Sequence, residues 1–240
     1  MRHHKLTERG TAPKKRVIVM KVEIAMPEMG PLEDQFRHFW IRHIFVGSVS
    51  DNYAVTGMAA NYVRLVEASI VEYRLAREQL TRFWSTHDGI AWGAMNRAIS
   101  HFEACLNDMQ RAIRAFNQMR SHSACPPALR QQIALRRPLF GTDTVSGQIR
   151  KLRDAVQHTE ERLRNGKLQA GDHYMLSATG PETPMLDEPG QTLKVIDRIE
   201  LQCHALMFKD IALWLDEMAQ FAAVIADHTG TTSPHGGVGR

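Results

Sequence analysis

The most regular hydrophobic pattern in the chain lies in residues 90–120. Apolar side chains recur there at alternating steps of three and four residues, at Trp92, Met95, Ile99, Phe102, Leu106, Met109, Ile113 and Phe116. This spacing places them on one face of a helix that needs a partner along most of its length. The pattern therefore predicts one arm of an antiparallel helical hairpin or bundle, with these side chains as packing residues rather than cofactor contacts.

Other segments show helical spacing of their apolar residues as well. Residues 51–84 are predicted to form the second long helix, and residues 143–165 a third, which ends at the Asn165-Gly166 cap signal. Its predicted buried stripe consists of Val145, Ile149, Leu152, Val156 and Leu163. Further helices are predicted over residues 32–46 and 207–227, and a short one over 128–135 within the long connection 121–144.

The hydrophobic period changes after Gly171. Residues 173–178 and 193–203 alternate apolar and polar positions, and the Gly/Pro-rich segment 180–190 separates them. This alternation predicts two or three short antiparallel strands, with Asp197-Arg198 as a tight turn within the second run. The expected fold is therefore mainly α: a bundle of four to five core helices with a small antiparallel β insertion at about 172–204, before the last helix.

The composition is that of one globular domain. Of 240 residues, 43% are hydrophobic and 23% charged, which is enough for one substantial core. We expect a single domain over residues 32–228. Residues 1–31 are predicted to be a flexible N-terminal arm that could add an edge strand, and residues 229–240 a disordered tail.

The expected compartment is the cytoplasm. The apolar run at residues 17–26 is interrupted by Lys21 and Glu23, and no small-residue cleavage site follows it. No segment is apolar for long enough to cross a membrane. The three cysteines are scattered and odd in number, unlike a disulfide framework or a zinc site. Neither a bound metal nor a cofactor is predicted.

Positive charge is concentrated between Arg111 and Arg153. This segment holds nine basic residues and one acid, Asp143, although the net charge of the whole chain is only +4. Such a concentration favours binding to RNA or DNA phosphates. The predicted RNA-binding residues are Arg120, Arg136, Arg137, Arg150 and Lys151. Alternatively, these side chains point in different directions and only keep two helices and a loop soluble.

The basic segment leads into a short pattern of residues that is suited to the cleavage of a phosphodiester. In the stretch IRKLRDAVQH at residues 149–158, four residues separate Arg153 from His158. An arginine can hold a phosphate through paired hydrogen bonds, and a histidine can move a proton near neutral pH. The two lie about 140° apart around a helix, on the flanks of the buried stripe. Asp154 lies one turn before His158, so an Arg150-Asp154-His158 ladder could orient the histidine or could simply be a solvated helix face.

The chain resembles the HEPN superfamily over residues 51–227. The resemblance consists of two long antiparallel helices, a third helix with the motif, a strand insertion and a final helix. Arg153 matches the family arginine, Asp154 the polar residue that commonly follows it, and His158 the histidine found four to six residues later. The arm before residue 32, the 121–144 connection and the extended strand region are not part of the family pattern.

The resemblance implies a metal-independent endoribonuclease that works as a homodimer, with the motif at the groove between two copies. Many members of the superfamily are toxins or antiviral effectors, so an antitoxin or another regulatory protein is an expected partner. Arg153 would bind the scissile phosphate, and His158 would take the proton from the ribose 2′-hydroxyl, giving a cyclic phosphate and a free 5′-hydroxyl. The alternative is a non-catalytic helical module that binds RNA or a protein partner.

Overall fold

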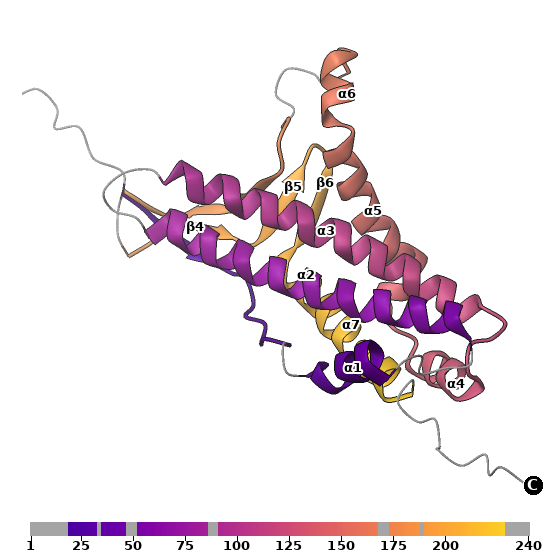
Figure 1. Ribbon diagram of the computed structural model, residues 1–240. Helices are drawn as coiled ribbons and strands as arrows, with labels where there is room; N and C mark the ends of the chain where they lie inside the picture. The colour runs from indigo at the N-terminus through magenta and orange to yellow at the C-terminus, as the bar shows by residue number, and fades with distance from the viewer. Residues whose placement is uncertain are drawn as a thin grey trace, which may run out of the picture.

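A computed structural model describes residues 19–32, 35–46, 52–85, 91–167, 173–187 and 190–228. Figure 1 shows a helical body with small sheets at one side. Its helices are α1 (Arg37–Ile41), the π-helical turn η1 (Arg42–Val46), α2 (Tyr53–Ser85), α3 (Trp92–Ser121), α4 (Pro127–Arg136), the 3₁₀ turn η2 (Leu139–Gly141), α5 (Asp143–Gln157), α6 (Thr159–Arg164) and α7 (Phe208–His228). Its strands are β1 (Val19–Ile24), β2 (Ser177–Thr179), β3 (Glu182–Pro184), β4 (Gln191–Ile196), β5 (Arg198–Leu201) and β6 (His204–Met207).

The predicted hairpin is formed by α2 and α3, which lie side by side along most of their lengths (Figure 1). The α2 helix begins after Asn52, whose side-chain oxygen accepts hydrogen bonds from the backbone N–H groups of Ala54 and Val55 at 3.1 and 3.2 Å. Six residues of the predicted α3 stripe, from Ile99 to Phe116, are buried, whereas Trp92 at the end of the hairpin is 62% exposed. The hydrophobic period therefore predicted both long helices correctly.

The last helix, α7, packs against this hairpin. The residues predicted to face the bundle are all buried: Phe208, Ile211, Leu215, Met218 and Ile225. The Tyr62 hydroxyl of α2 donates a hydrogen bond to the Met218 carbonyl at 3.1 Å, deep in the core. Burial raises the pKa of this tyrosine, and the nearby Glu217 carboxylate adds to the shift. The hydroxyl is thus a neutral donor that ties α2 to α7.

An aromatic cluster fixes the connection between α4 and α5. Phe140 of η2 lies 5.0 Å from Phe116 of α3 and 5.8 Å from Phe221 of α7, measured between ring centroids. A Cβ atom at Gly141 would come within 3.2 Å of the Phe116 ring, so a glycine lets the loop lie directly on this cluster. The predicted short helix is also present, as α4. The long connection is therefore an ordered part of the core.

Two small sheets cover one side of the helical body. One sheet has the strand order β1-β4-β3 and the other β2-β5-β6. The predicted antiparallel pairing of the two runs is confirmed for β2 with β5. Two strands outside the predicted runs also pair antiparallel, β3 with β4 and β6 with β5, whereas β1 pairs with β4 in parallel. This edge strand comes from the N-terminal arm, and Met26 just after it is buried in the core. Residues 19–31 are thus part of the packed body.

The strand region is divided more finely than its alternation predicted. The run 193–203 contains parts of β4 and β5, which belong to different sheets, so the tight turn predicted at Asp197-Arg198 is wrong: Asp197 separates the two strands and Arg198 begins β5. Gln202 turns the chain at φ 56° before β6. Gly180 separates β2 from β3, and a Cβ atom there would lie 1.8 Å from the Val195 carbonyl oxygen. Only glycine allows the backbones to approach this closely, so Gly180 sets the crossing between the two sheets.

The predicted helix at 32–46 is shorter and less regular than expected. It begins at Arg37 and changes to a π-helical turn at Arg42. Phe36 and Phe39 of the predicted face are buried, but Ile44 is 65% exposed, so its assignment to the buried face was wrong. A π turn holds an additional residue and rotates the later side chains relative to the α-helical period, which explains the difference.

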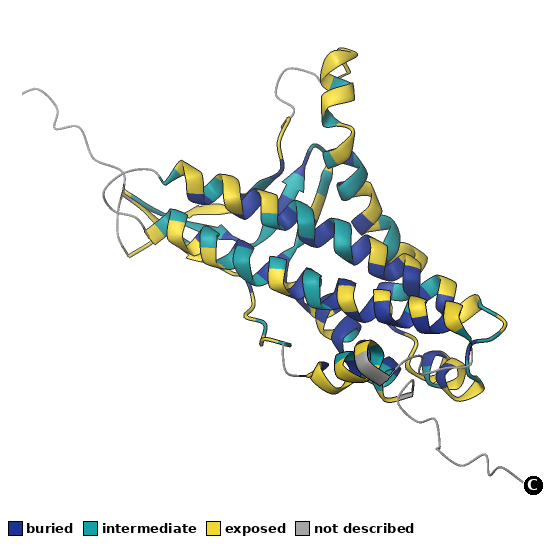
Figure 2. Ribbon diagram, viewed as in Figure 1, coloured by how far each residue is buried: buried dark blue, intermediate teal, exposed yellow. Residues whose placement is uncertain are grey.

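The predicted helix at 143–165 is interrupted at His158. It begins as expected, with the Thr142 hydroxyl accepting a hydrogen bond from the Val145 N–H at 3.4 Å. The Thr159 hydroxyl donates to the Ala155 carbonyl at 2.7 Å, a side-chain bond that bends helices. Beyond this bend α6 has no buried residue and extends away from the body (Figures 1 and 2), so Leu163, 51% exposed, does not continue the buried stripe. The predicted left-handed cap is present at Gly166, φ 62°.

The fold class is the predicted one, mainly α with a small β region. Buried residues lie on the inner faces of α2, α3, α5 and α7 (Figure 2). Within the described ranges, no helix has the length and apolar character needed to cross a membrane. Residues 1–18 of the predicted arm and the predicted tail at 229–240 lie outside the described residues.

Candidate functional site

Arg153 lies on α5 with most of its side chain buried. Its guanidinium donates from Nη1 to Asp154 Oδ1 at 3.0 Å, and the side chain is 20% exposed. Its Nε atom is buried without a hydrogen-bond partner among the described residues. A buried N–H of a charged group without a partner is energetically unfavourable, so this guanidinium retains unused hydrogen-bonding capacity.

The Arg153 side chain lines a hollow of about 170 Å³ between α3 and α5. The other lining residues are Glu103, Leu106, Asn107, Val156 and Gln157. Burial raises the pKa of the Glu103 carboxyl. A guanidinium and a carboxyl with a raised pKa therefore border the same small space.

His158 lies at the bend between α5 and α6. Its backbone φ of −98° and ψ of 8° leave the helical region, and its side chain is 58% exposed. The imidazole Nδ1 lies 3.3 Å from Glu161 Oε2, one turn further on. A carboxylate at this distance can hold one ring nitrogen and leave the other directed elsewhere. His158 lines a second hollow, of about 400 Å³, with Glu161, Arg162, Asn165 and Lys167.

The two motif side chains therefore line different hollows, which have no lining residue in common among the described residues. The predicted Arg150-Asp154-His158 ladder does not form, because Asp154 pairs with Arg153 and His158 pairs with Glu161. The bend at His158 accounts for both findings, since it changes the direction in which the imidazole leaves the helix. The motif is thus present as two separately supported groups near one end of α5.

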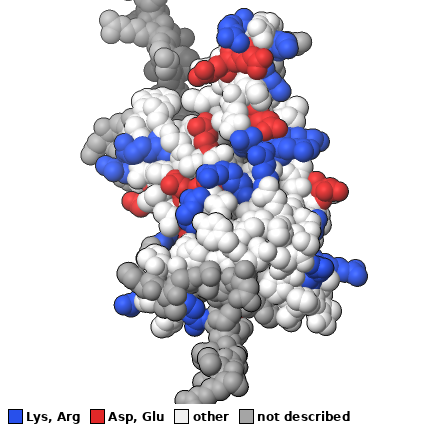
Figure 3. Space-filling view, turned by 45° about the vertical axis from the view of Figure 1, so that its right-hand side comes forward, with Lys and Arg blue, Asp and Glu red and all other residues white. Residues whose placement is uncertain are grey.

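The predicted RNA-binding residues are distributed over several surfaces. On the face seen in Figure 3, Lys and Arg atoms form separate groups divided by uncharged surface, with acidic groups between some of them. Arg150 and Lys151 are exposed on α5, and the Arg136 guanidinium lies 5.9 Å from the centroid of the Phe221 ring. Arg120 and Arg137, by contrast, line the same pocket.

This pocket, the arginine pocket, has a volume of about 480 Å³. It is formed by the end of α3, one side of α4 and the loop that enters α5. Its lining residues are Arg120, Ser121, Arg130, Ile133, Ala134, Arg137, Pro138, Gly141 and Thr142. Three guanidinium groups that are 7 to 17 residues apart in the sequence thus border one hollow with an apolar wall.

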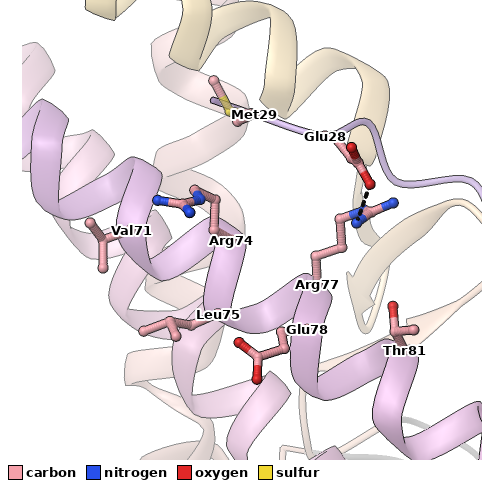
Figure 4. Close-up of a pocket in the computed structure, with 8 residues that line it drawn as sticks. All are labelled: Glu28, Met29, Val71, Arg74, Leu75, Arg77, Glu78 and Thr81. Carbon is pink, nitrogen blue, oxygen red and sulfur yellow. Dashed lines mark ion pairs between the residues drawn. The ribbon is translucent and has the colours of Figure 1, made fainter. Parts of the chain in front are cut away.

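A further hollow, of about 590 Å³, lies between α2 and the segment after β1 (Figure 4). It contains none of the predicted site residues. Arg77 points to Glu28, with 2.8 Å between Nη1 and Oε1, and Glu78 adds a second carboxylate on the same helix. Because its charges are paired or balanced, this hollow has no surplus charge that would select a ligand, and we assign it no role.

Three residues of these surfaces were not included in the predicted site. Glu161 follows His158 by three residues, so helical spacing alone could have identified it. Arg130 lies within the basic segment, but its place beside Arg120 depends on how α4 folds back. Glu103 belongs to α3, and only the packing of α3 against α5 brings it to Arg153. Comparison of the chain with protein-family models, curated proteins and solved structures finds no match.

Proposed function

We propose that the protein is a metal-independent endoribonuclease of the HEPN type, acting in the cytoplasm as a homodimer. Arg153 binds and stabilises the scissile phosphate, and His158 transfers the proton. The observation that carries the proposal is that each motif side chain has its own carboxylate partner: Asp154 for Arg153, at 3.0 Å, and Glu161 for His158, at 3.3 Å. Such partners orient a guanidinium and an imidazole before the substrate binds.

The proposed reaction needs only these groups and the substrate. The imidazole removes the proton from the ribose 2′-hydroxyl, whose oxygen attacks the adjacent phosphorus. The bond to the 5′-oxygen of the next nucleotide breaks, and that oxygen takes up the proton that the imidazolium now carries. The guanidinium stabilises the charge that develops on the phosphoryl oxygens. The products are a 2′,3′-cyclic phosphate and a free 5′-hydroxyl.

The proposed dimer is motivated by the geometry of one chain. Because Arg153 and His158 line different hollows, the guanidinium of one chain needs an imidazole from elsewhere. A second copy that packs against the bend between α5 and α6 would supply it, and two-fold symmetry would then form two equivalent sites. Asp154 would take part by positioning Arg153 rather than by contacting RNA.

Cleavage of labelled RNA in EDTA tests the proposal. The wild type should cut, whereas Arg153→Ala and His158→Ala should each cut at least about 100-fold more slowly, the usual contribution of a positioned acid or base. His173→Ala is a matched control, because His173 is 59% exposed and lies 3.9 Å from the Glu200 carboxylate, much as His158 lies beside Glu161. Circular dichroism would confirm that each variant folds. Equal rates for all four proteins would refute the assignment.

A non-catalytic RNA-binding module is the second candidate. The separation of Arg153 and His158 favours it, because the two groups line different hollows of one chain. RNA binding without cleavage in several substrates would select this candidate.

If the protein is a nuclease toxin controlled by an antitoxin, its expression should slow the growth of the host, and His158→Ala should relieve the effect.

A further inference from the structure

We propose that the arginine pocket binds a backbone phosphate of single-stranded RNA and seats the adjoining nucleotide. This inference rests on the proposed function, because it takes RNA as the ligand. It assigns the binding of RNA to a place other than the Arg153 and His158 hollows, at the opposite end of α5.

The pocket has positive charge that the protein itself does not neutralise. None of Arg120, Arg130 and Arg137 forms an ion pair with a carboxylate within the described part of the chain. Asp143, exposed in the first turn of α5, is the one acid between residues 111 and 153. Three cations around one hollow repel one another, and an anion between them relieves that repulsion.

The three arginines have different tasks. Arg130 Nη2 donates to the carbonyl oxygens of His122, Ser123 and Cys125, at 3.2, 3.3 and 3.4 Å. These bonds fix the turn before α4, so Arg130 shapes the wall of the pocket. The guanidinium groups of Arg120 and Arg137 make no such bonds to any residue that the structure describes. The Arg120 guanidinium lies over the Phe116 ring, 5.9 Å from its centroid, which leaves its N–H groups available for a ligand.

The backbone at Arg137 supports a role for its side chain. This residue ends α4 in the left-handed conformation, with φ 44° and ψ 63°, and its N–H donates to the Ile133 carbonyl at 3.2 Å. Glycine or asparagine is the usual residue at such a helix end, because a Cβ atom makes the conformation unfavourable. An arginine there gives the fold no advantage, whereas it gives the pocket a guanidinium.

The size and the walls of the pocket fit a nucleotide. A volume of about 480 Å³ lies within the range of small-molecule sites, which runs from about 300 to 1,000 Å³. Ile133, Ala134 and Pro138 provide an apolar surface on which a base or ribose can lie. Because Arg120 and Arg137 are both exposed, a strand can enter and leave the pocket on the solvent side. A phosphate between guanidinium groups beside an apolar wall is a common arrangement in the binding of single strands.

Fluorescence anisotropy with a short labelled single-stranded RNA, in EDTA, tests the proposal. The double variant Arg120→Gln/Arg137→Gln should bind at least about tenfold more weakly than the wild type, as expected for lost charged hydrogen bonds. The slope of log affinity against log salt should also become shallower by about 0.7, the contribution of one phosphate contact on a single strand. Arg114→Gln/Lys209→Gln removes the same charge from two exposed residues outside the pocket. This control should bind within about threefold of the wild type.

Equal losses in the two double variants would overturn the pocket and leave only a general effect of charge. An affinity of the pocket variant that matches the wild type, or a wild type that binds no RNA at low salt, would also overturn it. Cleavage of the same RNA is measured in parallel to separate this inference from the proposed function. Loss of binding in the pocket variant of a protein that never cuts would uphold the pocket and refute the nuclease. Cutting by a pocket variant that binds RNA normally would uphold the nuclease and overturn the pocket.

Discussion

The two ends of α5 differ in how the protein holds its basic side chains. At the C-terminal end, Arg153 and His158 each lie beside a carboxylate and line separate hollows. At the N-terminal end, Arg120 and Arg137 have no carboxylate partner among the described residues and line one pocket together with Arg130. The first arrangement keeps side chains in fixed orientations, and the second keeps positive charge available. We therefore expect the first end to carry out chemistry and the second to bind phosphate.

Replacing RNA by DNA of the same sequence should separate the two ends most completely. DNA lacks the 2′-hydroxyl that attacks the phosphorus, so we expect no cleavage in EDTA, whereas binding should stay within about threefold because the phosphates remain. Gel electrophoresis and anisotropy on the same samples would measure both. Cleavage of DNA would contradict the mechanism, and a loss of DNA binding would mean that the pocket reads the ribose.

The Arg153→Lys variant probes the end at which we expect the chemistry. Lysine keeps the charge but loses the planar fork that can pair with Asp154 and a phosphate at once. We expect kcat to fall about tenfold or more and KM to change less than about twofold, because orientation is lost while attraction persists. Steady-state cleavage rates over a range of RNA concentrations would show the split. A rise in KM alone would instead make Arg153 a binding residue.

The Arg137→Gly variant tests the proposed phosphate-binding end with a substitution that the backbone conformation favours. Glycine accepts the left-handed conformation, so the free energy of unfolding should stay unchanged or rise by up to about 1 kcal/mol. RNA affinity should fall about three- to tenfold through the lost guanidinium. Urea denaturation and anisotropy would measure the two effects. A clear loss of stability would show that Arg137 supports the loop instead of the ligand.

The Glu103→Gln variant should have the smallest effect, and it tests whether Arg153 has a second acidic partner. Burial raises the pKa of the Glu103 carboxyl, because it disfavours the charged form in the folded state. Above that pKa the carboxylate therefore destabilises the fold. As the pH falls below it, Glu103 is protonated and this destabilisation is lost. The variant should therefore be more stable at pH 7, by less than about 1 kcal/mol because solvent screens this half-exposed group. Near pH 4, below the raised pKa, the gain should become small. Thermal melts at both pH values would measure the gain. A loss of stability at pH 7 would indicate a favourable interaction with Arg153.

Helical period predicted most of the fold because it reports which face of a segment is buried. The bounds of α2, α3, α4 and α7 agree with the predicted ranges to within about two residues, a normal uncertainty for helix ends. Period cannot report local hydrogen bonds, so the bend that the Thr159 hydroxyl makes with the Ala155 carbonyl was missed. The hydrophobic period also does not show which strands distant in the sequence pair with each other. The parallel pairing of β1 with β4 was therefore not predicted.

The candidate site was predictable only where it is local in sequence. Spacing placed Arg153 and His158 near each other along the chain but did not show that the bend directs them into separate hollows. Charge counting identified Arg120 and Arg137 as members of a basic segment. Their meeting in one pocket depends on the fold of α4 and on Phe140, whose packing with Phe116 holds the loop in place. Such convergence is a property of tertiary packing.

Complementation between two inactive variants tests the central claim most directly. If Arg153 of one chain acts with His158 of another, co-expressed Arg153→Ala and His158→Ala chains will form mixed dimers that each contain one intact site. The co-purified protein should then cut RNA in EDTA at about a quarter of the wild-type rate, because half of the dimers are mixed and one of their two sites is complete. Each variant alone should remain inactive. A mixture no more active than its components would contradict a site shared between two chains.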